Sequence, residues 1–388
     1  MIKKSSIVLF LISCLFSFAQ TVTRKIVLKD IDTQAPIEDA TVLIAKTKQI
    51  LLSNIEGTVI FDLNGTSTIQ ISHTSYISTT IRSNNLKDKE TILFLKSNVN
   101  DLDEIIITKQ HPQKILISLV ENSKKKLTTP ARLKIYSREF FKMNGEYSYY
   151  NDGLMNFQIS DNSKKFKTDI LVEQNRSVGL VDANVTNDLL GYNLNDIMEN
   201  YYNFKYLNPV LDPKYKKDYD FLIKGYSPNK DYYVMTIIPL DDSKGLLDDV
   251  KVIYDYKKKI IIEATTFLNP VTVNKTDEKT AIGSKNIFKS NFKNIYKFDG
   301  SSYYLVTSKE EIGYDVIEKK GKKNIEVRNY FVTTNFSSQS YSFKDSDVFK
   351  DKTLFNKKNV ILTDYWNTSG LTATDEELQI IKDIEDEK

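Results

Sequence analysis

Residues 30–42, DIDTQAPIEDATV, decide the fold of the first part of the chain. Pro36 fixes its own φ just ahead of an apolar stretch, so it marks the approach to a strand. Ala40 and Val42 are two positions apart and therefore share one face of that strand. The polar residues before Pro36 form a turn. This stretch predicts β-strands that are joined by short turns.

Residues 53–57, SNIEG, continue the pattern, because the final glycine is free to adopt the positive φ of a tight hairpin. Val59 and Phe61 then point to one face of the next strand. Further short β-prone runs follow at a spacing of about 8–12 residues, which is typical of a sandwich. We therefore expect about seven strands over residues 20–109, with the last strand at residues 103–108.

The same residues carry a family resemblance. The pattern Asp30-x-x-Thr33-x-x-Pro36-Ile37-x-x-Ala40-x-Val42, followed by Ser53-Asn54-x-Glu56-Gly57, resembles the carboxypeptidase-regulatory-like domain. The resemblance covers about residues 20–108 and implies a transthyretin-like β-sandwich, common at the N-terminus of exported envelope proteins of Gram-negative bacteria. The chain departs from the family at Ile26 and Ser75, where glycine is preferred, and at Val59, where an aromatic residue is expected. These departures concern turn details.

The resemblance does not imply a metallopeptidase. A zinc carboxypeptidase holds its metal with two histidines and a glutamate. The chain has only His73 and His111, and the third residue after each is Tyr76 and Lys114, not glutamate. We therefore predict no zinc carboxypeptidase activity and only the accessory domain of such enzymes.

Residues 1–19 have the pattern of a secretory signal. Lys3 and Lys4 precede an apolar run that is shorter than the roughly 20 residues of a transmembrane helix, and Ser17 and Ala19 fit the cleavage site. Cleavage after Ala19 predicts export to the periplasm or to the periplasmic face of the outer membrane. No later stretch is long and apolar enough to predict a transmembrane helix.

Cys14 allows a second interpretation. Residues 11–14, LISC, resemble the lipobox of bacterial lipoproteins, which would anchor the chain through an acylated Cys14. Leu15 and Phe16 continue the apolar run, whereas a lipid-tethered chain usually leaves its anchor through polar residues. We therefore expect cleavage after Ala19, which leaves the mature chain without cysteine or disulfide.

The composition excludes several classes of protein. The 388 residues include 54 Lys plus Arg and 51 Asp plus Glu, a net charge of +3 that argues against nucleic-acid binding. Hydrophobic residues make up 40% of the chain, enough for a packed core. The chain has 23 tyrosines and 20 phenylalanines but only 2 histidines and 1 cysteine, so chemistry built on clustered His or Cys is not expected.

The remainder divides into three segments. Residues 110–130 read as a helical linker that begins at Pro112. Residues 131–345 contain consecutive strands with short turns, which predict a larger antiparallel β meander of about nine strands and one short helix. Residues 346–388 end in an acidic helix, with Thr374 and Glu377 as a capping box. Trp366 is expected to act as a packing anchor.

Two architectures fit a meander of this size, because its edges must be hidden. One is a half-barrel covered by helices, weakly similar to the lipoprotein-carrier fold that holds acyl chains. The other is a small outer-membrane barrel, which the charges at Lys251, Asp255 and Glu263 disfavour. The stretch 102–108 also resembles the junction to the plug of TonB-dependent receptors. The rest of the chain is too short for their barrel.

No stretch predicts a catalytic, cofactor-binding or metal-ligating residue. The 13 glycines never come closer than eight positions, which excludes the common nucleotide-binding loops. His73 and His111 are interpreted as ordinary strand and linker residues. Residues 241–242 and 248–249 are aspartate pairs around a loop, where solvated charge is expected and weak calcium binding is the alternative.

The leading hypothesis is a non-enzymatic cell-envelope protein that binds or scaffolds an envelope partner and associates peripherally with the outer membrane. The first alternative is a carrier of an acyl or other apolar ligand, which predicts an apolar cavity in the second domain. The second alternative is a carboxylate-dependent hydrolase, which predicts two acidic side chains in one cleft with shifted pKa values. The sequence alone does not identify the ligand or the partner.

Overall fold

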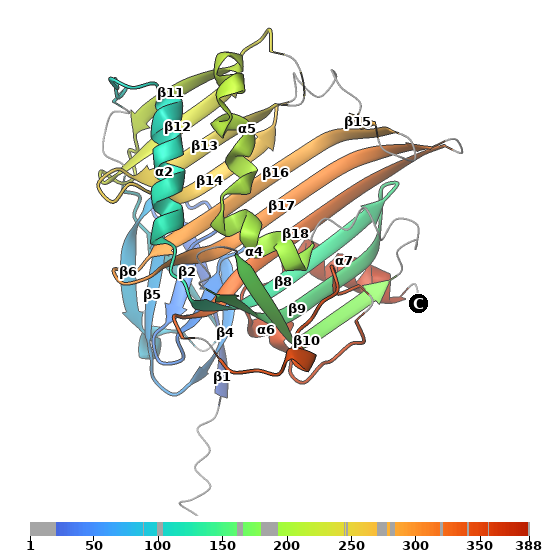
Figure 1. Cartoon of the computed structure of the whole chain (residues 1–388). Coiled ribbons are helices and arrows are strands. Elements are labelled where there is room, and N and C mark those ends of the chain that lie inside the picture. Colours follow the sequence, from blue (N-terminus) through green and yellow to red (C-terminus); the bar gives the residue numbers. More distant parts are fainter. Residues whose placement is uncertain are drawn as a thin grey trace, which may run out of the picture.

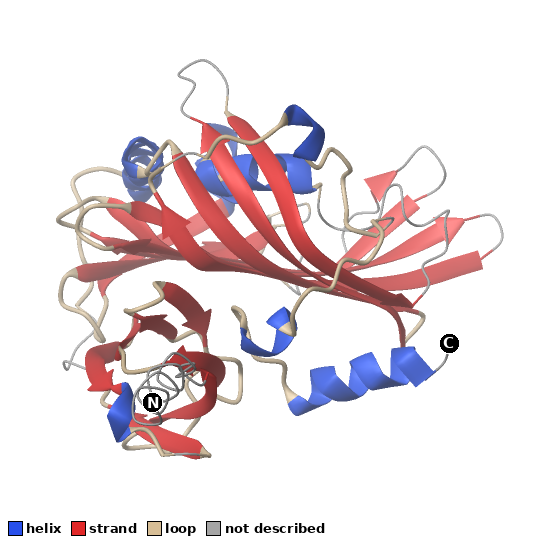
Figure 2. Cartoon of the chain, turned by 90° about the horizontal axis from the view of Figure 1, so that it is seen from below, coloured by secondary structure: helices blue, strands red, loops and turns tan. Residues whose placement is uncertain are grey.

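A long twisted β-sheet forms the middle layer of the protein, with helices on one face and a β-sandwich and the C-terminal helix on the other (Figures 1 and 2). The structure is a computed structural model. It describes residues 21–87, 89–98, 104–160, 166–179, 193–243, 245, 247–269, 278–279, 284–318, 321–339, 341–355 and 357–386. The predicted signal at residues 1–19 lies outside the described residues.

The sandwich forms from the first seven strands within the described residues, as the sequence predicts. They are β1 (Thr21–Asp30), β2 (Thr41–Ile44), β3 (Gln49–Leu52), β4 (Thr58–Asn64), β5 (Thr68–His73), β6 (Tyr76–Arg82) and β7 (Glu90–Leu95), with the short 3-10 helix η1 (Ser83–Asn85) before β7. One sheet has the order β4-β1-β7 and the other β3-β2-β5-β6. Val59 and Phe61 are fully buried between them, as their alternation predicts. Gly57 has a φ of +72°, and a Cβ there would lie 2.3 Å from the Leu28 carbonyl oxygen.

The large sheet contains eleven strands in the described part of the chain. They are β8 (Ala131–Met143), β9 (Glu146–Ser160), β10 (Lys167–Gly179), β11 (Tyr219–Gly225), β12 (Tyr232–Pro239), β13 (Asp248–Asp255), β14 (Ile260–Leu268), β15 (Glu278–Lys279), β16 (Ser284–Phe298), β17 (Tyr303–Glu318) and β18 (Gly321–Ser337). Their order is β10-β9-β8-β18-β17-β16-β14-β13-β12-β11, with β15 paired to β16. All of these pairs are antiparallel, and the sheet does not close into a barrel.

The large sheet consists of two antiparallel meanders, one of β8 to β10 and one of β11 to β18, which are joined in the middle of the sheet. The chain enters at β8, runs outward to β10, crosses to the far edge at β11 and returns strand by strand to β18. There β18 pairs with β8, for example Phe331 with Ser137. Short turns predict that strands consecutive in the sequence are neighbours in the sheet. No such turn links β18 to β8, so the sequence does not predict this pair.

Helices cover one face of this sheet, which we call the helix-covered face (Figure 2). They are α2 (Pro112–Lys126), α4 (Leu194–Tyr202), η2 (Lys205–Leu207), α5 (Asn208–Leu211) and η3 (Pro213–Asp218). Leu116 and Leu119 of α2 and Met198 of α4 are buried against strand residues such as Phe157 and Val252, in the main hydrophobic core. The helix predicted from Pro112 is α2 and the short helix predicted within the meander includes α4, and each buries one apolar face.

The sandwich and the last two helices of the C-terminal segment pack on the other face, the sandwich-covered face, whereas residues 353–354 of that segment lie on the helix-covered face. The segment contains η5 (Asp345–Asp347), α6 (Tyr365–Thr368) and α7 (Asp375–Asp386). Ile50 and Leu52 of β3 join Tyr136, Val306 and Val332 of the sheet in one buried cluster. The backbone N–H of Leu52 also donates to the Gly370 carbonyl oxygen at 2.8 Å. The sandwich therefore contacts both the sheet and the C-terminal segment.

A buried ion pair fastens α7 to this face. Arg138 of β8 is 1% exposed, and its Nη1 lies 2.8 Å from Oε2 of Glu377. Its Nη2 donates to the Leu371 carbonyl oxygen at 2.9 Å and to the Tyr136 hydroxyl at 2.8 Å. Glu377 and Thr374 also form the predicted capping box, with both hydrogen bonds at 3.1 Å. One carboxylate thus both starts the helix and attaches it to the sheet.

Two details of the sequence interpretation are wrong. Residues 104–108, the described part of the stretch expected to close the sandwich, contact the large sheet instead: the N–H of Ile106 donates to the Ile223 carbonyl oxygen at 2.9 Å. The free edge of β11 offers unpaired backbone groups to this segment. The spacing of Leu378, Ile381 and Ile384 predicts the face of α7 that docks on the sheet. Ile381 and Ile384 are buried as expected, but Leu378 is 50% exposed and Ile380 is buried in its place. The Arg138–Glu377 ion pair turns Glu377 inward and Leu378 to solvent.

Within the described residues, no helix is long and apolar enough to cross a membrane.

Candidate functional site

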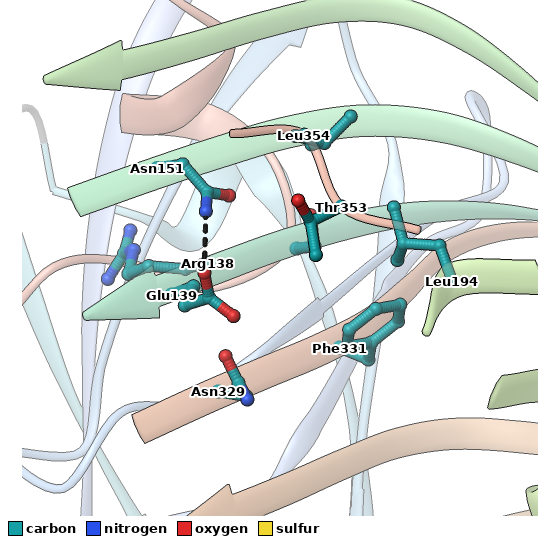
Figure 3. Close-up of a pocket in the computed structure, with 9 residues that line it drawn as sticks. Arg138, Glu139, Asn151, Leu194, Asn329, Phe331, Thr353 and Leu354 are labelled. Atoms are coloured by element: carbon teal, nitrogen blue, oxygen red, sulfur yellow. Dashed lines mark hydrogen bonds between the residues drawn. The ribbon is translucent and has the colours of Figure 1, made fainter. Parts of the chain in front are cut away.

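A pocket opens on the helix-covered face between the sheet, α4 and the stretch at residues 353–354, and we call it the sheet pocket (Figure 3). Its volume is about 300 Å³, including the part that is open to solvent. It is lined by Ser137, Arg138, Glu139, Asn151, Leu194, Asn329, Phe331, Thr353 and Leu354. The lining comes from three adjacent strands, one helix and the C-terminal segment.

Strand register brings the polar side chains of the pocket together. Glu139 of β8 lies opposite Asn151 of β9 and opposite Asn329 of β18. Side chains that oppose each other across strands share one face of a sheet. Ser137 and Phe331 form the next pair along the same face, and Phe331 belongs to the main core. The polar group therefore faces the helices and not the sandwich.

Glu139 is a buried carboxyl group with one hydrogen-bond donor. It is 7% exposed, and Nδ2 of Asn151 donates to its Oε1 at 2.9 Å. No cationic side chain in the described residues lies within ion-pair distance of it. Burial raises the pKa of Glu139 to about 7, against the smaller opposite effect of the Asn151 hydrogen bond. At neutral pH the group is therefore in part protonated, and in that form it can donate a hydrogen bond.

Asn329 is 1% exposed, yet neither Nδ2 nor Oδ1 of its amide has a hydrogen-bond partner within the described residues. A buried polar group that is left unpaired destabilises a fold by about 1–3 kcal/mol, so such groups are uncommon. The amide offers one acceptor and two donors in the pocket (Figure 3). Two further buried groups on the same face, Ser308 of β17 and Asn294 of β16, also lack partners in this part of the chain. We call Asn329, Ser308 and Asn294 the unpaired belt.

The opposite wall of the pocket is apolar. Leu194, Phe331 and Leu354 lie beside the polar group in Figure 3. The N–H of Leu194 donates to the Lys352 carbonyl oxygen at 2.8 Å, which ties the start of α4 to the C-terminal segment. Gly153 of β9 leaves room for Leu354, because a Cβ at this position would lie 2.5 Å from its Cδ1 atom. The pocket thus pairs a hydrogen-bonding wall with an apolar wall.

The residues singled out by sequence lie elsewhere. His111 caps α2, since its Nδ1 accepts from the N–H of Gln113 at 3.1 Å. His73 is partly buried where the sandwich meets the sheet. Burial and, less strongly, the positive charge of Lys293 lower its pKa to about 4, against the weaker opposite effect of the negative charge of Asp39. The aspartates at 241–242 are exposed. Asp249 accepts from Nδ2 of Asn269 at 2.8 Å.

Trp366 packs in the sandwich-covered face. Its ring lies edge-on to Tyr365, with ring centroids 5.2 Å apart, and the guanidinium carbon of Arg176 lies 4.2 Å from its centroid. This environment agrees with the packing role expected from the sequence. Within the described residues, no group of three or more His, Cys, Asp or Glu side chains is placed to hold a metal ion.

Glu139, Asn151 and Asn329 were missed at the level of sequence. The sequence of β8 did contain a signal. Leu133, Ile135 and Phe141 alternate along the strand and are buried on one of its faces. Ser137 and Glu139 occupy the positions between them on the same face, so they are directed into the core. Polar residues on the apolar face of a strand indicate either a hydrogen-bonded core or a binding site. The partner positions on β9 and β18 required the register of the folded sheet.

No family model and no curated protein matches this chain. A search of solved structures finds distant likenesses. Lipovitellin, in a structure that describes its lipid–protein interactions, matches at 10% identity and a TM-score of 0.26, over 55% of this chain and 26% of that chain. A LolA superfamily protein from Nitrosomonas europaea matches at 10% identity and a TM-score of 0.21, over 60% and 97%. A protein of unknown function from Bacteroides fragilis matches at 9% identity and a TM-score of 0.16, over 81% and 99%.

Proposed function

We propose that this chain is an exported, non-enzymatic binding protein that holds an amphipathic small molecule in the sheet pocket. One observation carries the proposal: the unpaired amide of Asn329 and the weakly hydrogen-bonded carboxyl group of Glu139 face an apolar wall in a covered pocket. Ligand pockets commonly combine a mainly apolar lining with a few polar groups that fix the orientation of the ligand.

The geometry defines the ligand class. A polar head that both accepts and donates hydrogen bonds satisfies Asn329 and Glu139. An acyl chain or a similar apolar body then lies against Leu194, Phe331 and Leu354. The enclosed part of the pocket has room for about one water molecule, so an acyl chain enters only when Leu194 or Leu354 moves aside.

In this proposal the sandwich has a supporting role. Its contacts to the sheet and to the C-terminal segment bury residues of all three parts. The regulatory-like resemblance of residues 20–108 and the signal at residues 1–19 suggest that the protein works in the bacterial envelope, on the periplasmic side. The mass of the mature protein tests export. Residue 20 at the N-terminus supports cleavage after Ala19, whereas a diacylated Cys14 contradicts it.

Titration of the mature chain with decanoic acid and with decanol, followed by calorimetry, tests the ligand class. Asn329→Leu removes the unpaired amide at nearly constant volume. We expect it to weaken binding at least tenfold, which corresponds to about 1.4 kcal/mol. Asn291→Leu is the matched control, because Asn291 is exposed on β16 of the same sheet.

The apo form of Asn329→Leu should be as stable as the wild type or more stable, because an apolar residue replaces an unpaired buried amide. A variant that folds well and loses the ligand therefore supports the proposal. Failure of both probes to bind the wild type, or equal affinity in the wild type and in Asn329→Leu, contradicts it.

A further inference from the structure

A second cavity lies between the sandwich and the large sheet, and we call it the interdomain cleft. Its sandwich side comes from β2, β5 and β6, and its sheet side comes mainly from β14, β16 and the turn after β13. The volume is about 990 Å³, including the part that is open to solvent. Clefts between two packed units are common places for small ligands.

The carboxylates on the walls of the cleft are already paired with cations. Asp39 lies 2.8 Å from Nζ of Lys293 and 2.6 Å from Nζ of Lys309. Asp255 lies 2.6 Å from Nζ of Lys258, and its other oxygen accepts from the backbone N–H groups of Lys257 and Lys258 at 3.0 and 2.8 Å. These acidic groups therefore have little capacity left for a cationic ligand.

Lys297 is the exception among the cations that line the cleft. It is partly buried, and no carboxylate in the described residues lies within 4.0 Å of its ammonium group. Burial lowers the pKa of Lys297, against the weaker opposite effect of Asp299. A desolvated ammonium without a partner is unfavourable, and an anion beside it would reverse that.

His73 adds a donor to the same cleft. Its Nδ1 accepts from the N–H of Ser75 at 3.0 Å, and the low pKa keeps the ring neutral at physiological pH. The ring proton of this neutral form is therefore on Nε2, which donates a hydrogen bond. Lys297 and His73 thus offer the cleft a cation and an N–H donor, while Ile262 and Ile295 supply apolar surface beside them.

We propose that the interdomain cleft binds a small organic anion with a carboxylate or phosphate group, with Lys297 as the counter-ion and His73 as a hydrogen-bond donor. The positions of both groups on the wall of one cleft, beside acidic groups that are already paired, support this assignment. The site is separate from the sheet pocket, which lies on the opposite face of the sheet, and does not depend on the ligand proposed there.

Calorimetric titration of the full mature chain with citrate and with inorganic phosphate tests the proposal. Lys297→Gln removes the charge and keeps most of the side-chain length. We expect it to weaken binding of the better anion at least tenfold. Lys251→Gln is the matched control, since Lys251 is an exposed lysine on β13. Tighter binding of citrate assigns a carboxylate ligand, and tighter binding of phosphate assigns a phosphorylated one.

Chemical labelling gives a readout that does not require a variant to fold. Acetylation of wild-type lysines at pH 8, quantified site by site by mass spectrometry, should be slowed several-fold at Lys297 by the bound anion and unchanged at Lys251. Binding of neither anion, equal affinity in the wild type and in a folded Lys297→Gln, or absence of protection at Lys297 overturns the proposal.

Discussion

Replacement of Glu377 by glutamine leaves the guanidinium of Arg138 without its counter-ion in the interior. The two groups are 2.8 Å apart, and their side chains are only 1% and 4% exposed. Loss of one partner of a buried ion pair typically destabilises a protein by about 3–5 kcal/mol, because the remaining charge stays buried. Glutamine keeps the shape and can still form the capping box with Thr374. The destabilisation therefore reports on the charge and not on the helix start.

Trp366 provides the assay. It is the only tryptophan in the chain, and it lies on the same face of the sheet, with its ring 4.2 Å from the guanidinium carbon of Arg176. Urea unfolding followed by its fluorescence, together with hydrogen exchange of the α7 amides, should show a loss of about 3–5 kcal/mol in Glu377→Gln. Glu376→Gln, at an exposed position of the same helical turn, should change stability by no more than about 0.5 kcal/mol.

A double-mutant cycle with Arg138→Met separates the pair from its surroundings. We expect the double variant to be more stable than the sum of the two single effects predicts, by about 2 kcal/mol or more, because neither charge then remains alone. A loss below about 1 kcal/mol in Glu377→Gln, or an additive cycle, would show that α7 is held by apolar contacts and that the ion pair is not needed.

Three further substitutions test the protonation states and the shape of the sites. The folded state raises the pKa of Glu139 to about 7, so folding takes up a proton between about pH 4.5 and 7. As the pH rises through this window, the wild type should lose about 3 kcal/mol of stability relative to Glu139→Gln. Urea unfolding at pH 5 and pH 8 measures this loss. The folded state lowers the pKa of His73 to about 4. The wild type should therefore lose about 3 kcal/mol of stability relative to His73→Gln as the pH falls from about 6.5 to 4. Parallel curves of unfolding free energy against pH for the variant and the wild type would contradict this. Gly153→Ala should destabilise the protein by about 1–3 kcal/mol by displacing Leu354 and should weaken ligand binding in the sheet pocket; an unchanged Tm and affinity would show that Leu354 moves freely.

The parts of the fold that the sequence predicts are those with local signals. Alternation and turns locate the strands of the sandwich, and the spacing of Thr374 and Glu377 locates the start of α7. The parts that were wrong depend on distant partners. Ile106 pairs with the edge of β11, and the buried face of α7 is turned by an ion pair to Arg138, which is more than 200 residues away. No local pattern contains either contact.

The two faces of the large sheet differ in how their buried polar groups are satisfied. On the sandwich-covered face, Arg138 is paired with Glu377 of α7 at 2.8 Å, and Arg176 is paired with Asp152 at 2.9 Å. Asp152 also accepts from the Tyr365 hydroxyl at 2.7 Å, so both groups contact the C-terminal segment. On the helix-covered face, Asn329 and its neighbours in the unpaired belt have no partner in the described residues. In the same part of the chain, the sandwich-covered face also has a buried atom without a partner, Nε of Arg176, but Asn329 and Asn294 lack partners for both atoms of their amides. Polar groups that a fold does not satisfy internally are the ones a ligand can satisfy, and this contrast is why binding is assigned to the helix-covered face.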